Sequence, residues 1–245
     1  MKIAQIRQKV VDKIEFDNDF GGGMTINFLG DSITAGAGIS SPQDIYSAIV
    51  CKDLGAKENN YGVGGTGFAE KRKPSDNLEY DRNFCIRAKE MDKTADFVFV
   101  FGGTNDYGHG DAPIGSLSDE YPKTFCGAVT VLVKYLISVY GKGKLCFLLP
   151  THRYLEDDPC GERGSEFPIA PLSEFIHVEK LILDKFGVDY LDLRNCFPEP
   201  QTNTGDDFTV DGLHLNELGH KMIADRIEEY FSKKIKDLKK ISEKK

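Results

Sequence analysis

The stretch TINFLGDS, residues 25–32, decides the fold class. It is a short run rich in large apolar side chains, and runs of this kind are typical of parallel strands that are covered on both faces. Three further runs have the same character, namely DFVFVFGG at 96–103, KLCFLLP at 144–150 and VDYLDLR at 188–194. A weaker fifth strand is expected at 56–60. The sequence therefore predicts a sheet of parallel strands.

Segments with helical periodicity lie between these strands. We expect helices at about 43–54, 78–92, 119–140, 171–186 and 216–237. Strands that alternate with helices form right-handed βαβ units, which build a doubly wound sheet. Residues 104–118 and 150–170 are rich in glycine, proline and polar groups, so we expect them to be long loops.

The composition fits one globular domain. The chain has 245 residues, of which 40% are apolar and 29% are charged, and this balance supplies enough apolar side chain for a single large core. We expect the domain to span 25–237, after an N-terminal extension at 1–24 and before a basic tail at 238–245. The net charge of −8 argues against a nucleic-acid partner, because phosphate binding depends on clustered lysine and arginine.

The N-terminal residues and the cysteines favour a cytoplasmic location. Residues 1–25 carry Glu15, Asp17 and Asp19 among short apolar groups, so they lack the uninterrupted apolar core of a secretory signal. No stretch approaches the length of a membrane span, and we expect no membrane partner. The six cysteines, at 51, 85, 126, 146, 160 and 196, have no close pairs, which indicates a reducing compartment and no structural zinc.

The stretch NNYGVGGTGFAE, residues 59–70, contains a G-x-G-x-x-G pattern from Gly62 to Gly67. A dinucleotide site with this pattern needs an apolar strand before it, a helix that starts inside it and an acidic residue about 20 positions later. The preceding residues are charged, and Pro74 stands where the helix should continue. Considered alone, the stretch is better explained as a flexible glycine-rich turn.

Polar side chains follow the predicted strands, and ligands of parallel sheets bind beyond the carboxyl ends of the strands. A serine there becomes a nucleophile when a histidine takes its proton and an acid orients that histidine. Ser32, His214 and Asp211 supply these three types. The residues alone leave two alternatives open: Ser32 could cap the following helix, and Asp211 with His214 could form a polar turn.

Four sequence blocks resemble those of the SGNH hydrolases, the GDSL esterase and lipase superfamily. They are FLGDSITAG, NYGVGGTG, GGTND and DGLHLNELGH, and the similarity spans about 26–220. Ile33 stands where leucine is typical. The resemblance implies that Ser32 is the nucleophile, and that the backbone N–H groups of Ser32 and Gly65 and the side chain of Asn105 form the oxyanion hole. Gly64 is the alternative donor, and Gly65 is chosen because it lies five residues after Asn60.

We therefore expect a three-layer α/β/α, flavodoxin-like sandwich with a five-stranded parallel sheet. The expected activity is that of a serine esterase for short-chain acyl esters, acetyl above all, on a small molecule or glycan, with no cofactor and no metal. The side chains expected to contact substrate are Asp31, Tyr107, His109, His152 and Arg153. The alternatives are a lipase or acyl thioesterase of the same family, a catalytically silent carbohydrate-binding or scaffold module, and a flavin- or nucleotide-binding protein. The sequence makes no prediction of the oligomeric state.

Overall fold

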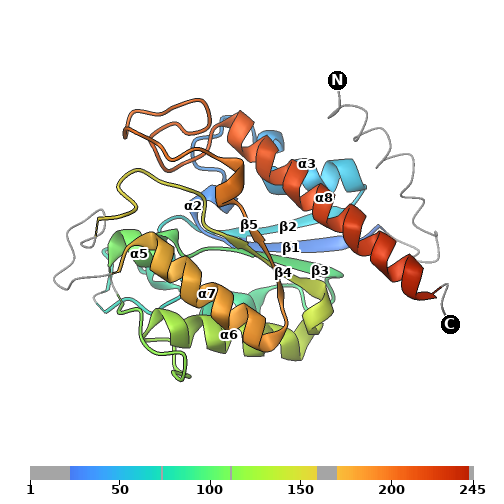
Figure 1. Cartoon of the computed structure of the whole chain (residues 1–245), viewed down its shortest axis with the longest axis horizontal. Helices are drawn as coiled ribbons and strands as arrows, with labels where there is room; N and C mark the ends of the chain where they lie inside the picture. The colour runs from blue at the N-terminus through green and yellow to red at the C-terminus, as the bar shows by residue number, and fades with distance from the viewer. Residues whose placement is uncertain (1–22, 73, 111, 159–169, 243–245) are drawn as a thin grey trace.

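The computed structural model describes residues 23–72, 74–110, 112–158 and 170–242. Five parallel strands form its sheet in the order β2–β1–β3–β4–β5, as Figure 1 shows. The strands are β1 (Thr25–Gly30), β2 (Lys57–Gly62), β3 (Phe97–Phe101), β4 (Leu145–Leu149) and β5 (Asp189–Asp192). The predicted doubly wound parallel sheet is confirmed. The domain boundaries stay a prediction, because most of the extension at 1–24 and the end of the tail lie outside the described residues.

Helices cover both faces of the sheet (Figure 1). α3 and α8 pack together on one face, and α6 and α7 pack together on the other. The α-helices are α2 (Ser32–Ala35), α3 (Tyr46–Leu54), α4 (Phe84–Arg87), α5 (Thr104–His109), α6 (Phe125–Tyr140), α7 (Leu172–Phe186) and α8 (Glu217–Ser242), with short 3₁₀ turns at Pro42–Asp44, Leu78–Asp81, Ala88–Glu90, Lys142–Lys144 and Arg194–Cys196. Within the described ranges, none of these helices is long and apolar enough to cross a membrane.

The burial of each strand in the core explains how clearly its sequence predicted it. Every residue of β3 and β4 is buried, because each strand has neighbours on both sides and helices on both faces. Side chains on one face join the cluster under α6 and α7, and those on the other face, such as the stacked pair Phe28 and Phe99, join the cluster under α3 and α8. β2 is an edge strand with no fully buried residue, which is why its sequence signal is weak.

The predicted helix at 78–92 is wrong. The chain instead forms a 3₁₀ turn, the four-residue α4 and a second 3₁₀ turn. Asn83 has an extended backbone, and its side chain accepts a hydrogen bond from Ile86 N, so a new helix has to begin there. Similarly, the helix expected from 119 begins only at Phe125, because the Thr124 side chain caps it through a bond from Gly127 N.

The predicted loop at 104–118 contains a helix that the sequence did not reveal. α5 is only six residues long, and it is flanked by Gly103 and Gly110, which both have left-handed backbones. A short segment between two glycines gives too few residues for a helical period to appear. The consequence is that Asn105 and His109 lie one turn apart on a helix rather than in an irregular loop.

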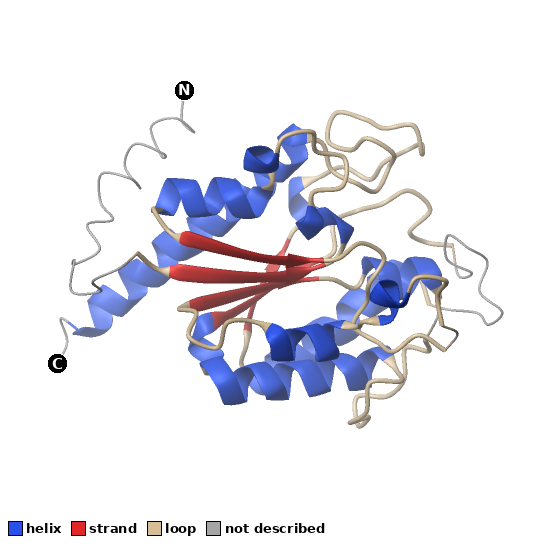
Figure 2. Ribbon diagram, turned by 180° about the vertical axis from the view of Figure 1, so that it is seen from behind, coloured by secondary structure: helices blue, strands red, loops and turns tan. Residues whose placement is uncertain are grey.

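The carboxyl ends of the strands meet at one edge of the sheet, where Figure 2 shows the loops gathered. In the register of β1, Gly30 pairs with Gly62 on one side and with Phe101 on the other. Gly62 is also pressed against the backbone that follows Ser32, because a Cβ atom at Gly62 would lie 2.3 Å from Ala35 N. The end of β2 therefore packs directly on α2.

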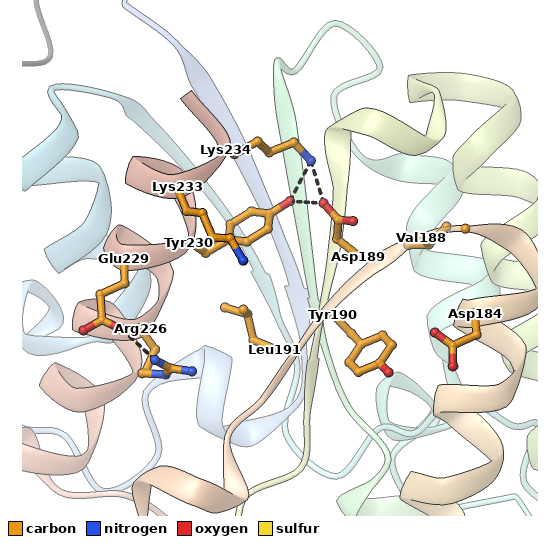
Figure 3. Close-up of a pocket in the computed structure, with 11 residues that line it drawn as sticks. Asp184, Val188, Asp189, Tyr190, Leu191, Arg226, Glu229, Tyr230, Lys233 and Lys234 are labelled. Atoms are coloured by element: carbon orange, nitrogen blue, oxygen red, sulfur yellow. Dashed lines mark hydrogen bonds and ion pairs between the residues drawn. The ribbon is translucent and has the colours of Figure 1, made fainter. Parts of the chain in front are cut away.

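A cleft of about 730 Å³ lies away from this edge, between the end of α7, the first residues of β5 and α8. In its wall, Asp189 Oδ2 accepts hydrogen bonds from Tyr230 Oη at 2.6 Å and Lys234 Nζ at 2.8 Å, as Figure 3 shows. None of the residues predicted for the active site lines this cleft. The residues predicted for the active site lie at the carboxyl ends of the strands instead.

We predict that Gly62→Ala lowers the free energy of unfolding by about 1–3 kcal/mol, because the new methyl group meets fixed backbone atoms rather than a movable side chain. Gly143→Ala is the matched control, because a Cβ atom there meets nothing within 4 Å, and we expect a change within about 0.5 kcal/mol. Urea denaturation of both variants measures the difference. Equal stabilities would contradict the close packing of β2 on α2.

Candidate active site

Ser32 is the first residue of α2, and Asp31 alone separates it from the end of β1. The cap of this helix is not Ser32 but Asp31, whose Oδ1 accepts a hydrogen bond from Ile33 N at 3.0 Å. The alternative in which Ser32 serves as the cap is therefore wrong. Its hydroxyl instead lies 3.0 Å from His214 Nε2.

Asp211 organises the loop that carries His214. Its Oδ1 accepts hydrogen bonds from Leu213 N at 3.0 Å and His214 N at 2.7 Å, and its Oδ2 lies 2.7 Å from His214 Nδ1. Partial burial pushes the pKa of Asp211 up, but the hydrogen bonds from His214 outweigh it and hold this pKa below its ordinary value. An ionised Asp211 accepts a hydrogen bond from the Nδ1–H group, which leaves Nε2 unprotonated and able to accept the Ser32 hydroxyl proton.

The loop after β2 runs beside Ser32. A Cβ atom on Gly64 would lie 3.7 Å from Ser32 Cβ, and one on Gly65 would lie 3.8 Å from His109 Cε1. Gly65 has φ +72°, a left-handed backbone that favours glycine. Asn105 Nδ2 donates to the carbonyl of Thr66 at 3.0 Å, so the first turn of α5 is tied to the same loop. The choice of Gly65 over Gly64 as oxyanion donor stays a prediction.

Three of the expected substrate contacts are enclosed by protein. Asp31, Tyr107 and Arg153 have exposed fractions of 1%, 0% and 3%. Asp31 caps α2, and Tyr107 Oη bonds the carbonyls of Leu155 and Asp158. Arg153 Nη1 donates to the carbonyl and hydroxyl of Thr104 at 3.0 and 3.1 Å. These side chains support the loops around the site from inside, and their contact with substrate stays a prediction.

The two histidines among the expected contacts lie nearer the surface. His109 ends α5, one turn after Asn105, and its ring faces Gly65. His152 is part-buried, and its Nδ1 lies 2.9 Å from Glu156 Oε1. Glu156 also accepts from Arg153 N and from the Arg194 guanidinium. The loop after β4 is therefore built around one buried carboxylate, and contact of either histidine with substrate stays a prediction.

Two buried acids, Asp106 in α5 and Glu179 in α7, were not identified from the sequence. Asp106 accepts hydrogen bonds from Phe68 N and Ala69 N, both at 2.9 Å, and burial raises its pKa to about 7. Glu179 in α7 is 0% exposed, and neither of its carboxyl oxygens has a hydrogen-bond partner among the described residues. Burial, and then the nearby charge of Asp106, raise the pKa of Glu179 well above its ordinary value.

The sequence did carry a signal for Glu179. The buried residues of α7 recur at helical spacing, and Glu179 occupies a position on that stripe where an apolar residue is expected. A Cβ atom on Gly103 would lie 3.5 Å from Glu179 Oε2. The carboxyl group therefore lies against the turn that leads into α5 and Asn105.

The chain resembles known proteins in both sequence and fold. The sequence profile of the GDSL-like Lipase/Acylhydrolase family matches residues 28–222. A crystal structure of a protein from Lactobacillus plantarum superposes with a TM-score of 0.69 at 24% identity, over 86% of this chain and 98% of that one. A carbohydrate acetylesterase from Sinorhizobium meliloti has a TM-score of 0.61 at 17% identity, over 85% and 98% of the two chains.

A member of the lipolytic G-D-S-L family from Veillonella parvula superposes with a TM-score of 0.55 at 19% identity, over 86% of this chain and 99% of that one. No curated protein matches the sequence. At these identities the three superpositions establish a shared fold, while the match of the family profile extends from β1 into α8.

We predict that Glu179→Gln stabilises the protein more at pH 8 than at pH 5. The pKa of Glu179 is higher in the folded chain than in the unfolded chain. Its contribution to the free energy of unfolding is therefore fully present below the unfolded pKa and is lost as the pH rises toward the folded pKa. Because each pH unit in that window is worth about 1.4 kcal/mol, the gain at pH 8 should exceed the gain at pH 5 by about 1 kcal/mol or more.

Urea denaturation at the two pH values measures this difference. The control is Glu199→Gln in an exposed loop, for which we expect changes within about 0.5 kcal/mol at both pH values. An equal effect of Glu179→Gln at pH 5 and pH 8 would mean that Glu179 titrates alike in the folded and unfolded chains.

Proposed function

The chain belongs to the GDSL-like lipase/acylhydrolase family, and from this premise we propose that it is a serine esterase that works through an acyl-enzyme. One observation carries the proposal. His214 lies 3.0 Å from the Ser32 hydroxyl through Nε2 and 2.7 Å from the Asp211 carboxylate through Nδ1. A nucleophile, a base and an orienting acid are thus within hydrogen-bond reach of one another.

In the first half of the reaction, Ser32 Oγ attacks the carbonyl carbon of the ester while its proton passes to His214 Nε2. The Asp211 carboxylate stabilises the imidazolium that forms. The tetrahedral oxyanion takes hydrogen bonds from the N–H groups of Ser32 and Gly65 and from the Asn105 amide. One Asn105 N–H donates to Thr66, so the second can serve the oxyanion.

Collapse of the tetrahedral intermediate breaks the bond to the alcohol oxygen. His214 returns its proton to that oxygen, and the alcohol leaves an acyl group on Ser32. A water molecule then attacks the acyl carbonyl, with its proton passing to His214 Nε2. When the second tetrahedral intermediate collapses, that proton returns to Ser32 Oγ and the carboxylic acid is released.

A short acyl group, acetyl above all, on a polar alcohol such as a sugar is the substrate we propose. The rim carries the polar side chains of His109 and His152. Among the described residues of the loops after α5, after β4 and before His214, the exposed large apolar side chains are few, namely Leu117, Tyr121, Leu155 and Val210. Hydroxyl groups suit such a rim better than an alkyl chain does. A carbohydrate acetylesterase shares the fold, which makes acetylated sugars the first natural substrates to test.

We predict that Ser32→Ala lowers kcat by about 10⁴-fold or more, because the nucleophile is lost. The fold should persist, because alanine is compatible with the first position of α2. His214→Ala is expected to be comparably damaging, since nucleophile and base act together. Hydrolysis of 4-nitrophenyl acetate measures kcat, and a fluorophosphonate probe measures covalent labelling of Ser32.

The matched control is Ser118→Ala, which removes another hydroxyl in an exposed turn and should keep wild-type activity and labelling. Folded Ser32→Ala with wild-type turnover would exclude the serine mechanism. Failure of the wild-type protein to react with the probe or with any ester would favour the catalytically silent binding module instead.

We also predict that kcat/KM is higher for 4-nitrophenyl acetate than for the decanoate, both measured below their micelle-forming concentrations. A long chain that meets few apolar side chains gains little of the roughly 0.8 kcal/mol available for each buried CH₂ group. Background hydrolysis is subtracted with Ser32→Ala. A tenfold or greater preference for decanoate would contradict the short-acyl proposal and favour a lipase or acyl thioesterase.

A further inference from the structure

Arg87 is a buried cation beside the candidate active site. It is the last residue of α4 and is 4% exposed, and its guanidinium lies 4.8 Å from the centre of the Phe84 ring. Burial lowers its pKa to about 10, which leaves it protonated at neutral pH. Its Nε donates to the carbonyl of Arg82 at 3.0 Å. The remaining donors of the guanidinium point toward the strand ends.

Arg87 joins the ends of two strands. Its Nη1 donates to the carbonyl of Tyr61 near the end of β2, and its Nη2 donates at 3.0 Å to the carbonyl of Gly30, the last residue of β1. Val63 N donates to the same Gly30 carbonyl at 3.1 Å. The strand that leads to Ser32 and the strand that leads to the glycine loop are therefore held together by one planar fork of donors, which a lysine could not reproduce.

Thr66 connects Arg87 to Asn105. The hydroxyl of Thr66 accepts from Arg87 Nη2 at 2.7 Å and donates to the carbonyl of Val63 at 2.7 Å. The carbonyl of Thr66 accepts from Asn105 Nδ2 at 3.0 Å. These bonds hold the carbonyl of Val63, which precedes Gly65, and the hydroxyl and carbonyl of Thr66, which follows it. The orientation of the Asn105 amide thus depends on a residue that Arg87 holds in place.

We propose that Arg87, acting through Thr66, is a positioning residue that presets the oxyanion hole before substrate binds. This inference rests on the proposed esterase function. Arg87 is enclosed by protein and touches no substrate, so its contribution is to the geometry of the donors. Because these donors act mainly on the tetrahedral oxyanion, loss of the link should lower kcat while KM changes little.

The experiment compares Thr66→Val, which deletes the hydroxyl at nearly constant volume, with Thr66→Ser, which keeps it. Arg87→Lys is the third variant. Arg82→Gln is the control because, among the described residues, the ion pairs of the Arg82 side chain are only those with the exposed Glu79 and Glu90. We expect Thr66→Val and Arg87→Lys to lose about 10- to 100-fold in kcat with KM within about threefold of wild type. Thr66→Ser and Arg82→Gln should keep kcat within about threefold.

Two further measurements separate positioning from a merely structural role. A phenylboronic acid, which forms a tetrahedral adduct on a nucleophilic serine, should bind less tightly to Thr66→Val and Arg87→Lys by the same factor as kcat falls. The side-chain amide protons of Asn105, followed by NMR, should exchange with solvent about tenfold faster in these two variants. Circular dichroism checks folding, and if Arg87→Lys does not fold, the two Thr66 variants carry the test.

The proposal is overturned if folded Thr66→Val keeps wild-type kcat, if KM rises while kcat is unchanged, or if Thr66→Ser is as impaired as Thr66→Val. Unchanged exchange of the Asn105 amide protons also overturns it. A wild-type protein that hydrolyses no ester would refute the esterase function alone, because the exchange measurement still decides whether Arg87 and Thr66 position Asn105.

Discussion

The register of β1 with its two neighbours is the constraint on which the candidate active site depends. Gly30 pairs with Gly62 and with Phe101, so the residues that follow these three strands leave the sheet side by side. Both glycines are required by close contact, because a Cβ atom on Gly30 would lie 1.9 Å from Thr34 Oγ1, and one on Gly62 would meet the backbone of Ala35. A shift of the register by one residue would separate Ser32 from the proposed oxyanion donors.

Buried ionisable side chains surround the strand ends at Gly30. They distinguish the candidate site from the apolar core, where burial stabilises the fold. Burial raises the pKa of Asp31 to about 6, although Asp31 accepts a bond from Ile33 N. Asp106 lies in α5 and Glu179 in the neighbouring α7, while Arg87 donates to the carbonyl of Gly30 and Arg153 donates to the carbonyl of Thr104. Such groups cost free energy to bury. Their retention fits a site in which the positions of a few donors matter more than maximal stability.

The sequence revealed those parts of the structure that local pattern determines. β1, β3 and β4 were predicted to within a few residues, because a strand with neighbours on both sides needs apolar side chains throughout. Ser32, Asp211 and His214 were identified from sequence blocks, and the fold brings them into contact. The burial of Tyr107 and Arg153 was not predicted, since it depends on contacts between segments far apart in the chain. The break at Asn83 is local, because the Asn83 side chain caps α4, but the helical period of the surrounding residues concealed it.

The site is assembled from parts that differ greatly in sequence separation. Asp211 and His214 are three residues apart and form a local unit, whereas His214 and Ser32 are 182 residues apart. Synthesis proceeds from the N-terminus, so a ribosome produces the proposed nucleophile long before the proposed base. A nascent chain therefore carries Ser32 as an ordinary, unreactive alcohol. Esterase chemistry of this kind would be latent throughout translation and would appear only after the segment with His214 has emerged and docked on the sheet.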